Sequence, residues 1–306
     1  PLVSNCRAKT ELPTWLAQSG VPAMEGLDTR ALVRRLRESG AMRGAISNDP
    51  AQTPESLLAA ARAAPDMSGA NLAESAGPGA PHRPSEDLGG WWDGARDMPM
   101  DRAALIGCGV TTGVGAVIHT AAVEPGSTVA VIGCGGIGLS AINGAALAGA
   151  SRIIAVDMVS SKLELARKFG ATDVVDASDG EAIEKVRELT GGGVHYSFEA
   201  IGLKATAEQA FRMLRPGGTA TVIGMIPPGQ MVELHGVDFL AEKKIQGSMM
   251  GSNRFRVDMP RFVDFYLQGK LHLDDMISNR IALSDINEGM AALETGEIAR
   301  SVIMFD

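Results

Sequence analysis

One stretch of the chain, VAVIGCGGIGLSAINGAALAGASRIIAVD over residues 129–157, restricts the possible folds more than any other. It begins as an apolar strand and then turns through Gly133, Gly135 and Gly138 in the spacing G-x-G-x-x-G. An alanine-rich helix and a second apolar strand follow, and that strand ends at Asp157, 19 residues beyond Gly138. Strand, glycine turn, helix, strand and acid in this order are typical of a dinucleotide-binding βαβ unit.

Each residue type in this pattern has a physical role. The first glycine permits the tight turn, the second lets a diphosphate approach the main chain, and the third lets helix and strand pack closely. The free N–H groups and the dipole at the helix start favour an anion. Asp157 can accept hydrogen bonds from ribose hydroxyls and would repel a 2′-phosphate, so NAD is favoured over NADP. The alternative is a structural glycine turn followed by an ordinary surface aspartate, and the complete βαβ context argues against it.

From Met98 onward the pattern alternates between strands and helices. Such alternation predicts an α/β fold with a Rossmann-type, doubly wound parallel sheet covered on both faces. The expected strands are Thr128–Ile132, Ile153–Val156, Asp173–Val175, His195–Phe198 and Thr219–Ile223. The expected helices between them include Ser160–Phe169, Glu181–Thr190 and Ala205–Leu214.

The first third of the chain has a different texture. Residues 1–76 predict a small, partial α+β segment with two short helices, one capped by Asp28 and one by Thr53. Residues 77–97 are rich in Pro, Gly, Arg and Trp and have no periodicity, which indicates an irregular linker. We therefore expect three regions: residues 1–76, the linker 77–97, and a nucleotide-binding domain over 98–306.

Composition excludes several classes of function. Apolar residues make up 45% of the chain, enough for a packed core, and the net charge is -8. An acidic chain is a poor match for nucleic acid or for a membrane surface, and we expect that no apolar run reaches the length needed to cross a bilayer. Three scattered cysteines do not form a disulfide framework, which favours the cytoplasm.

The third region, residues 98–306, also resembles a known family. The motifs GCGVTTG, FEAIG, VIGMIPPG and IARSV, together with the glycine turn, are similar to the coenzyme domain of zinc-dependent, medium-chain alcohol dehydrogenases, in the branch of the class III enzymes. The resemblance covers residues 98–306. It implies hydride transfer between a small-molecule alcohol, or a thiol hemiacetal, and NAD. It also implies a homodimer, formed through an edge strand near residues 243–251.

The resemblance assigns further positions in the site. It implies that Thr112 lies beside the nicotinamide ring and that Cys108 descends from a catalytic zinc ligand. The coenzyme contacts that it implies, beyond the glycines and Asp157 of the pattern itself, are Gly136, Ile137, Lys162, Ile223, Gly224, Met225 and Arg300.

Zinc chemistry in that family needs more ligands than this region supplies. The other two catalytic ligands, a Cys and a His, come from a preceding domain, and residues 1–97 hold only Cys6 and His82, outside the family's pattern. A single thiolate cannot hold a catalytic zinc tightly. We therefore expect a zinc site that is possible but incomplete, and an oxidoreductase that lacks part of its catalytic machinery. The alternative is a non-catalytic module for NAD binding or dimerisation.

The first region resembles a different family. The run GLDTRALVRRLRESGAMRGAI, over residues 26–46, is similar to part of the N-terminal domain of the carbamoyl-phosphate synthase small chain. The glutamine-hydrolysing residues of that family lie in a later domain, so none is assigned here. A fragment that binds a larger synthase subunit is thus a further alternative. Two unrelated families in one chain suggest a chimera.

Overall fold

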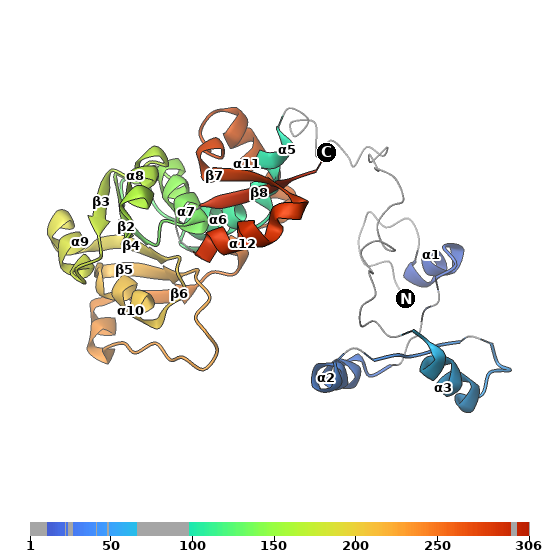
Figure 1. Ribbon diagram of the computed structural model, residues 1–306. Coiled ribbons are helices and arrows are strands. Elements are labelled where there is room, and N and C mark those ends of the chain that lie inside the picture. The colour runs from blue at the N-terminus through green and yellow to red at the C-terminus, as the bar shows by residue number, and fades with distance from the viewer. Residues whose placement is uncertain are drawn as a thin grey trace. The chain divides into compact units, whose positions relative to one another are not determined.

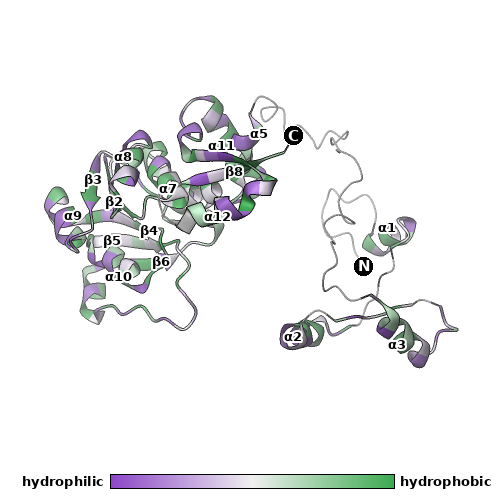
Figure 2. Cartoon of the chain, in the orientation of Figure 1, coloured by the Kyte–Doolittle hydropathy of each residue, from purple (hydrophilic) through white to green (hydrophobic). Residues whose placement is uncertain are grey.

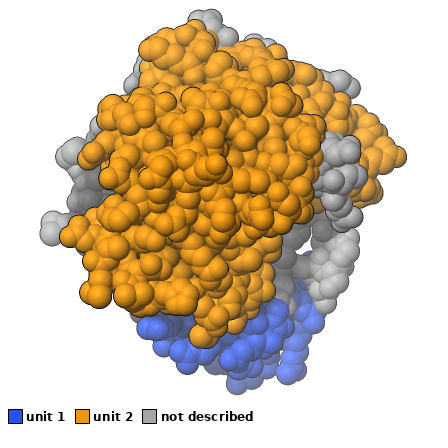
Figure 3. All heavy atoms as spheres, turned by 90° about the vertical axis from the view of Figure 1, so that its left-hand side faces the viewer, with its two compact units in different colours: residues 1–85 blue, residues 86–306 orange. Residues whose placement is uncertain are grey.

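The computed structural model describes residues 11–21, 23, 27–40, 42–47, 49–65, 98–294 and 299–305. The chain divides into two compact units, residues 1–85 and 86–306, which are coloured separately in Figure 3 and are treated separately below. Cys6, His82 and the expected linker 77–97 lie outside the described residues. The domain boundaries at residues 76 and 98 therefore stay a prediction.

The described part of the first unit contains three short helices, namely α1 (Leu12–Gln18), α2 (Thr29–Ser39) and α3 (Pro54–Ala63). The predicted caps are confirmed: Asp28 accepts a hydrogen bond from the N–H of Ala31 at 2.9 Å, and Thr53 accepts one from Ser56 at 3.2 Å. Such bonds satisfy N–H groups that have no partner within the helix. None of the three helices buries a residue, and Figure 2 shows hydrophilic and hydrophobic residues side by side on α2.

The second unit is built on a parallel sheet of six strands in the order β3-β2-β1-β4-β5-β6 (Figure 1). This order reverses direction between β1 and β4, as in the doubly wound dinucleotide-binding fold. The fold class predicted from the sequence is therefore confirmed. The strands are β1 (Thr128–Ile132), β2 (Arg152–Asp157), β3 (Asp173–Asp176), β4 (Val194–Glu199), β5 (Leu214–Val222) and β6 (Lys244–Gly247).

Helices cover both faces of this sheet, and each face has its own buried apolar cluster. Val129 and Val131 of β1 belong to one cluster, whereas Ala130 and Ile132 belong to the other, because successive side chains of a strand point to opposite faces. The first cluster includes residues of α7 (Gly136–Leu147), α8 (Ser160–Lys168) and α11 (Phe255–Leu267). The second includes residues of α9 (Ala182–Thr190) and α10 (Lys204–Arg212).

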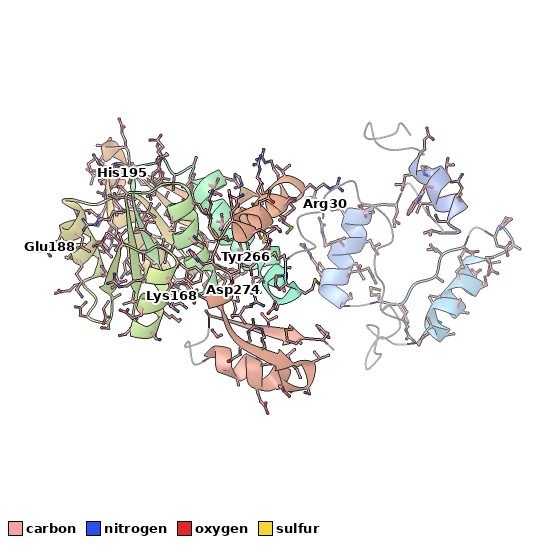
Figure 4. The ribbon with its side chains drawn as sticks, turned by 90° about the horizontal axis from the view of Figure 1, so that it is seen from above. Arg30, Lys168, Glu188, His195, Tyr266 and Asp274 are labelled. Atoms are coloured by element: carbon pink, nitrogen blue, oxygen red, sulfur yellow. The ribbon has the colours of Figure 1, made fainter. Side chains whose placement is uncertain are left out.

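A second, two-stranded parallel sheet pairs β7 (Ile277–Ala282) with β8 (Arg300–Met304), and α12 (Ile286–Glu294) lies between them in the chain. Buried Asp101 connects the two-stranded sheet to the start of the unit. Its carboxylate pairs with neighbouring Arg102 at 2.7 Å and with Arg280 of β7 at 2.8 Å. Arg102 also pairs with Asp274, which lies beside Tyr266 (Figure 4). Single 3₁₀ turns complete the unit at Gly236–Ala241, Met250–Ser252, Asp274–Met276 and Leu283–Asp285.

A long apolar helix precedes β1. It runs through α5 (Met100–Leu105), a π-helical turn (Ile106–Val110), α6 (Thr111–Gly115) and a second π-helical turn (Ala116–Thr120). Among the described residues, Met100–Thr120 is one helix long and apolar enough to cross a membrane, so the expectation that no apolar run reaches that length is wrong. Burial accounts for its composition, since 61% of its apolar window lies inside the unit.

Candidate functional site

The candidate site lies where the carboxyl ends of β1 and β4 meet. The two strands are register partners, with Ile132 beside Glu199, and the chain leaves them toward opposite faces of the sheet. In open parallel sheets, ligands bind beyond the carboxyl ends of the strands at such a reversal. The glycine turn follows β1 at this point.

The glycine turn brings the start of α7 against the end of β1. Gly133 has a φ of +93°, a conformation that glycine adopts without strain, and its N–H donates to the carbonyl of Val156 at 2.8 Å. A Cβ added at Gly138 would overlap the carbonyl oxygen of Gly133, whereas a Cβ at Gly135 would meet nothing within 4 Å. The third glycine is thus required by packing, and the second leaves open space at the N-terminus of α7.

Asp157 at the end of β2 is bonded directly to this turn. Its Oδ2 accepts from the N–H of Cys134 at 2.7 Å, and its Oδ1 accepts from the N–H of Val159 at 3.0 Å. Burial and the Asp157 carboxylate raise the pKa of the Cys134 thiol, while Lys162 on α8 acts in the opposite direction. Cys134 is buried, so packing is the role that its environment supports. Asp157 and Lys162 both lie within electrostatic reach of the turn.

Arg300, the first residue of β8, brings a positive charge to the same place. A Cβ at Gly136 would lie 2.5 Å from the guanidinium carbon of Arg300, and a Cβ at Gly109 would lie 2.9 Å from its Nη2. The guanidinium group therefore packs against the first residue of α7. A cation and a helix N-terminus together form a suitable environment for a diphosphate.

Three of the residues expected around the nicotinamide half of a dinucleotide, Ile223, Gly224 and Met225, follow β5 in the chain. The N–H groups of Ile223 and Gly224 both donate to the carbonyl oxygen of Glu199, at 2.8 and 3.0 Å. Met225 is 88% exposed. Ile137 is half-buried in the first turn of α7.

Sequence reasoning missed one residue of this region, Glu199. Glu199 is the last residue of β4 and is fully buried. The loop that follows it borders the glycine turn. An acid directly after an apolar strand was the available signal, the same signal that identified Asp157.

The candidate zinc ligand, Cys108, is not part of a group of metal ligands among the described residues. Cys108 is exposed in the π-helical turn, and no three His, Cys, Asp or Glu side chains of the described residues come together to hold a metal. The described donor set therefore does not fit a zinc ion, and no chemistry is derived from one. Thr112, one turn further along, is buried, and its hydroxyl lies 3.7 Å from the sulfur of Met250.

Two family models match separate parts of the chain. Residues 136–267 match the zinc-binding dehydrogenase family, and residues 2–46 match the CPSase domain of the carbamoyl-phosphate synthase small chain. Both resemblances noted in the sequence are confirmed. The first match includes the glycine turn from Gly136, Asp157 and the residues after β5.

Individual relatives agree with the first match. Alcohol dehydrogenase class-3 of Cereibacter sphaeroides is 39% identical over 218 residues, which are 68% of this chain and 58% of that protein. The crystal structure of benzyl alcohol dehydrogenase from Acinetobacter calcoaceticus is similar with a TM-score of 0.67 and 33% identity, over 69% of this chain and 58% of that one.

A second similar structure carries a coenzyme. A zinc-binding dehydrogenase from Sinorhizobium meliloti bound to NADP matches with a TM-score of 0.56 and 31% identity, over 61% of this chain and 54% of that one. The chain spans a little over half the length of the curated relatives it matches.

Proposed function

We propose that this chain, whose residues 136–267 match the zinc-binding dehydrogenase family and which is similar to alcohol dehydrogenases over about two thirds of its length, binds NAD at the turn between β1 and α7. One observation carries the proposal: the glycine turn, the Asp157 carboxylate and the Arg300 guanidinium meet at the N-terminus of α7. Together they offer an anion site and a hydroxyl acceptor, the two kinds of group that recognise the diphosphate and the ribose of a dinucleotide.

The diphosphate would rest on the N-terminus of α7. The open space at Gly135 allows close approach to the main chain, and Arg300 supplies the charge that balances the diphosphate. Lys162 adds a further positive charge close to the turn. This half of the site does not depend on a reacting group, so it should also bind ADP-ribose.

The adenosine ribose would lie against Asp157. Each of its carboxylate oxygens accepts one main-chain N–H and keeps a second lone pair for a ribose hydroxyl. A 2′-phosphate at this position would face the carboxylate, which disfavours NADP. The neighbour from Sinorhizobium meliloti is bound to NADP, so the preference of this chain needs a direct comparison of the two coenzymes.

The nicotinamide would lie toward Thr112, Ile137 and the segment 223–225. Ile137 offers an apolar side chain for one face of the ring, and the main chain at 223–225 offers polar groups for the carboxamide. Bound NAD would supply a hydride acceptor, and in this family the donor would be an alcohol or a thiol hemiacetal. Because the described residues offer no group of three metal ligands, we propose that the 306-residue chain alone binds coenzyme without rapid turnover.

Calorimetric titration of the 306-residue chain with NAD and with NADP, alongside metal analysis, tests this proposal. We expect NAD to bind with a dissociation constant of about 1 μM or weaker, or roughly -8 kcal/mol, and NADP to bind more weakly. We expect less than one zinc per chain. No heat with NAD, or equal affinity for NADP, would contradict the assignment of Asp157.

A homodimer is a second proposal, carried by the position of β6. This strand ends the sheet order, so one of its edges has no partner strand among the described residues. An unpaired edge can pair with a second copy of the same chain. Sedimentation velocity should give twice the chain mass, and replacing Ile245 by Pro should return the chain to a monomer.

The match to the carbamoyl-phosphate synthase small chain supports another activity for the first unit, namely binding to a larger synthase chain. Co-purification of this chain with a larger synthase chain would support that function. A failure to co-purify would favour coenzyme binding as the activity of the 306-residue chain. Because the three cysteines lie far apart in the chain and do not form a disulfide framework, we also propose a cytoplasmic location.

A further inference from the structure

Glu199 occupies a place where a carboxylate is costly. It ends β4 between β1 and β5, with Ile132 and Val222 as register partners, and it has no exposed surface. Its Oε2 has no hydrogen-bond partner among the described residues. A buried oxygen without a partner costs free energy, and an apolar side chain would fill the same place without that cost. The carboxylate must therefore contribute something specific.

What it contributes is a set of three bonds to the loop that follows β4. Its Oε1 accepts from the N–H of Ile201 at 2.9 Å, from the N–H of Gly202 at 2.7 Å, and from the hydroxyl of Thr206 at 2.8 Å. The first two bonds fix the main chain of the loop. The third attaches that loop to the first turn of α10.

The main chain of the same residue holds the loop that follows β5. The carbonyl oxygen of Glu199 accepts from Ile223 and Gly224. A Cβ at Gly224 would overlap the nitrogen of Gly202 and would lie 2.6 Å from Oε2 of Glu199. The two loops are thus in direct contact, and one residue fixes both.

These loops border the glycine turn on the side away from Asp157. A Cβ at Gly133 would lie 2.5 Å from Cγ1 of Ile201. Asp157 lies on β2, on one side of β1, whereas the two loops follow β4 and β5, on the other side. A dinucleotide lies across the reversal of strand order, so a ligand with its adenosine at β2 has its second half at these loops.

We propose that Glu199 is a positioning residue for the nicotinamide half of the coenzyme. It presets the main chain at 201–202 and 223–224 without touching the ligand, because it is fully buried. This inference rests on the proposed function. It adds that the affinity for the two halves of NAD is controlled separately, with Asp157 acting on one half and Glu199 on the other.

The test compares NAD with ADP-ribose, which lacks the nicotinamide, on the full 306-residue chain. In the Glu199→Met variant, which keeps the length of the side chain but has no oxygen to accept the three bonds, we expect the NAD dissociation constant to rise about tenfold while that of ADP-ribose stays within about twofold. We also expect a smaller change in NADH fluorescence on saturation, which reports the surroundings of the nicotinamide. Glu188→Met, the same change at an exposed position on α9 (Figure 4), should alter none of these values.

A second variant guards against misfolding. Thr206→Val removes one of the three donors to Oε1 and should shift the NAD affinity in the same direction by a smaller factor. If the affinities for NAD and for ADP-ribose fall equally, Glu199 has a structural role only and the proposal fails. Unchanged NAD affinity in both variants would also overturn the proposal. If the unaltered chain binds neither ligand, the proposed function itself fails. If it binds both equally, only the inference about Glu199 fails.

Discussion

The N–H of Cys134 donates to the carboxylate of Asp157 at 2.7 Å, which connects the glycine turn to the end of the neighbouring strand. Asp157 is therefore not a free surface acid. The bond orients the carboxylate toward the N-terminus of α7 and holds the glycine turn in place. The same residue thus contributes to folding and, in the proposed function, to coenzyme recognition, and variants must separate these two roles.

Replacing Asp157 by Asn separates them. Asn keeps an acceptor oxygen for the Cys134 N–H, but it loses the acceptor for the Val159 N–H and has no charge for the ribose hydroxyls or against a 2′-phosphate. We expect NAD affinity to fall roughly tenfold, about 1.4 kcal/mol. We also expect the ratio of NAD affinity to NADP affinity to decrease. Calorimetry measures both. Asp176→Asn, at the matching end of β3, should leave both affinities unchanged, and an equal loss in that control would rule out a specific role for Asp157.

The glycine turn offers a matched pair of substitutions. Gly138→Ala places a methyl group on the Gly133 carbonyl, so we expect it to lower the free energy of unfolding by about 3 kcal/mol. Gly135→Ala meets no atom within 4 Å and should leave stability within about 0.5 kcal/mol. Its methyl group nevertheless stands where the diphosphate approaches, so it should weaken NAD binding. Thermal unfolding and calorimetry on both variants check this; a destabilised Gly135→Ala protein contradicts the packing argument.

Arg300 is expected to act on the diphosphate. Arg300→Ala should weaken NAD and ADP-ribose together by about tenfold, because both carry the diphosphate. The loss should shrink as salt is added, since screening weakens the charge interaction in the unaltered chain. Titrations at two salt concentrations measure it. Arg187→Ala, exposed on α9, serves as control, and a loss restricted to NAD would place Arg300 elsewhere in the site.

Acid should destabilise the unit through Asp101. The hydrogen bond from Arg102, helped by Arg280, lowers the pKa of Asp101 from 3.8 to about 2. A carboxylate with a lowered pKa stabilises the folded state above the unfolded value and loses that contribution as the pH falls through the folded value. Asp101→Asn should therefore cost about 2 kcal/mol near neutral pH, with a difference that shrinks between about pH 4 and pH 2.

Denaturant unfolding at several pH values measures the effect of Asp101. Asp275→Asn breaks an exposed ion pair with Lys168 and should have little effect at any pH. A difference between Asp101→Asn and the unaltered chain that stays constant down to pH 2 would show that the charge of Asp101 is not responsible.

Metal removal should leave coenzyme binding intact. Cys108 belongs to no group of three or more His, Cys, Asp or Glu side chains among the described residues, so a chelator has no described site to empty. We expect equal NAD affinity before and after dialysis against a chelator, and in the Cys108→Ser variant. A loss of affinity in either case would reveal a metal site completed by residues outside the described ranges.

Local pattern was sufficient for most of the sheet. The expected strand Thr128–Ile132 is β1 to the residue, and the other expected strands lie within their observed counterparts or within one residue of them, apart from the start of β5. That strand begins at Leu214 rather than Thr219, through Arg, Pro and two glycines. This run carries no strand signal, and only pairing with β4, across an irregular register, extends the strand into it.

The sequence by itself determined the βαβ unit, because spacing between neighbours fixes the turn, the helix start and the acid at the end of β2. Only the tertiary structure decided that Arg300 packs on Gly136 and that Glu199 fixes two loops. Both relationships join segments that are far apart in the chain or follow different strands. Such contacts depend on strand order and helix packing, which local periodicity does not contain.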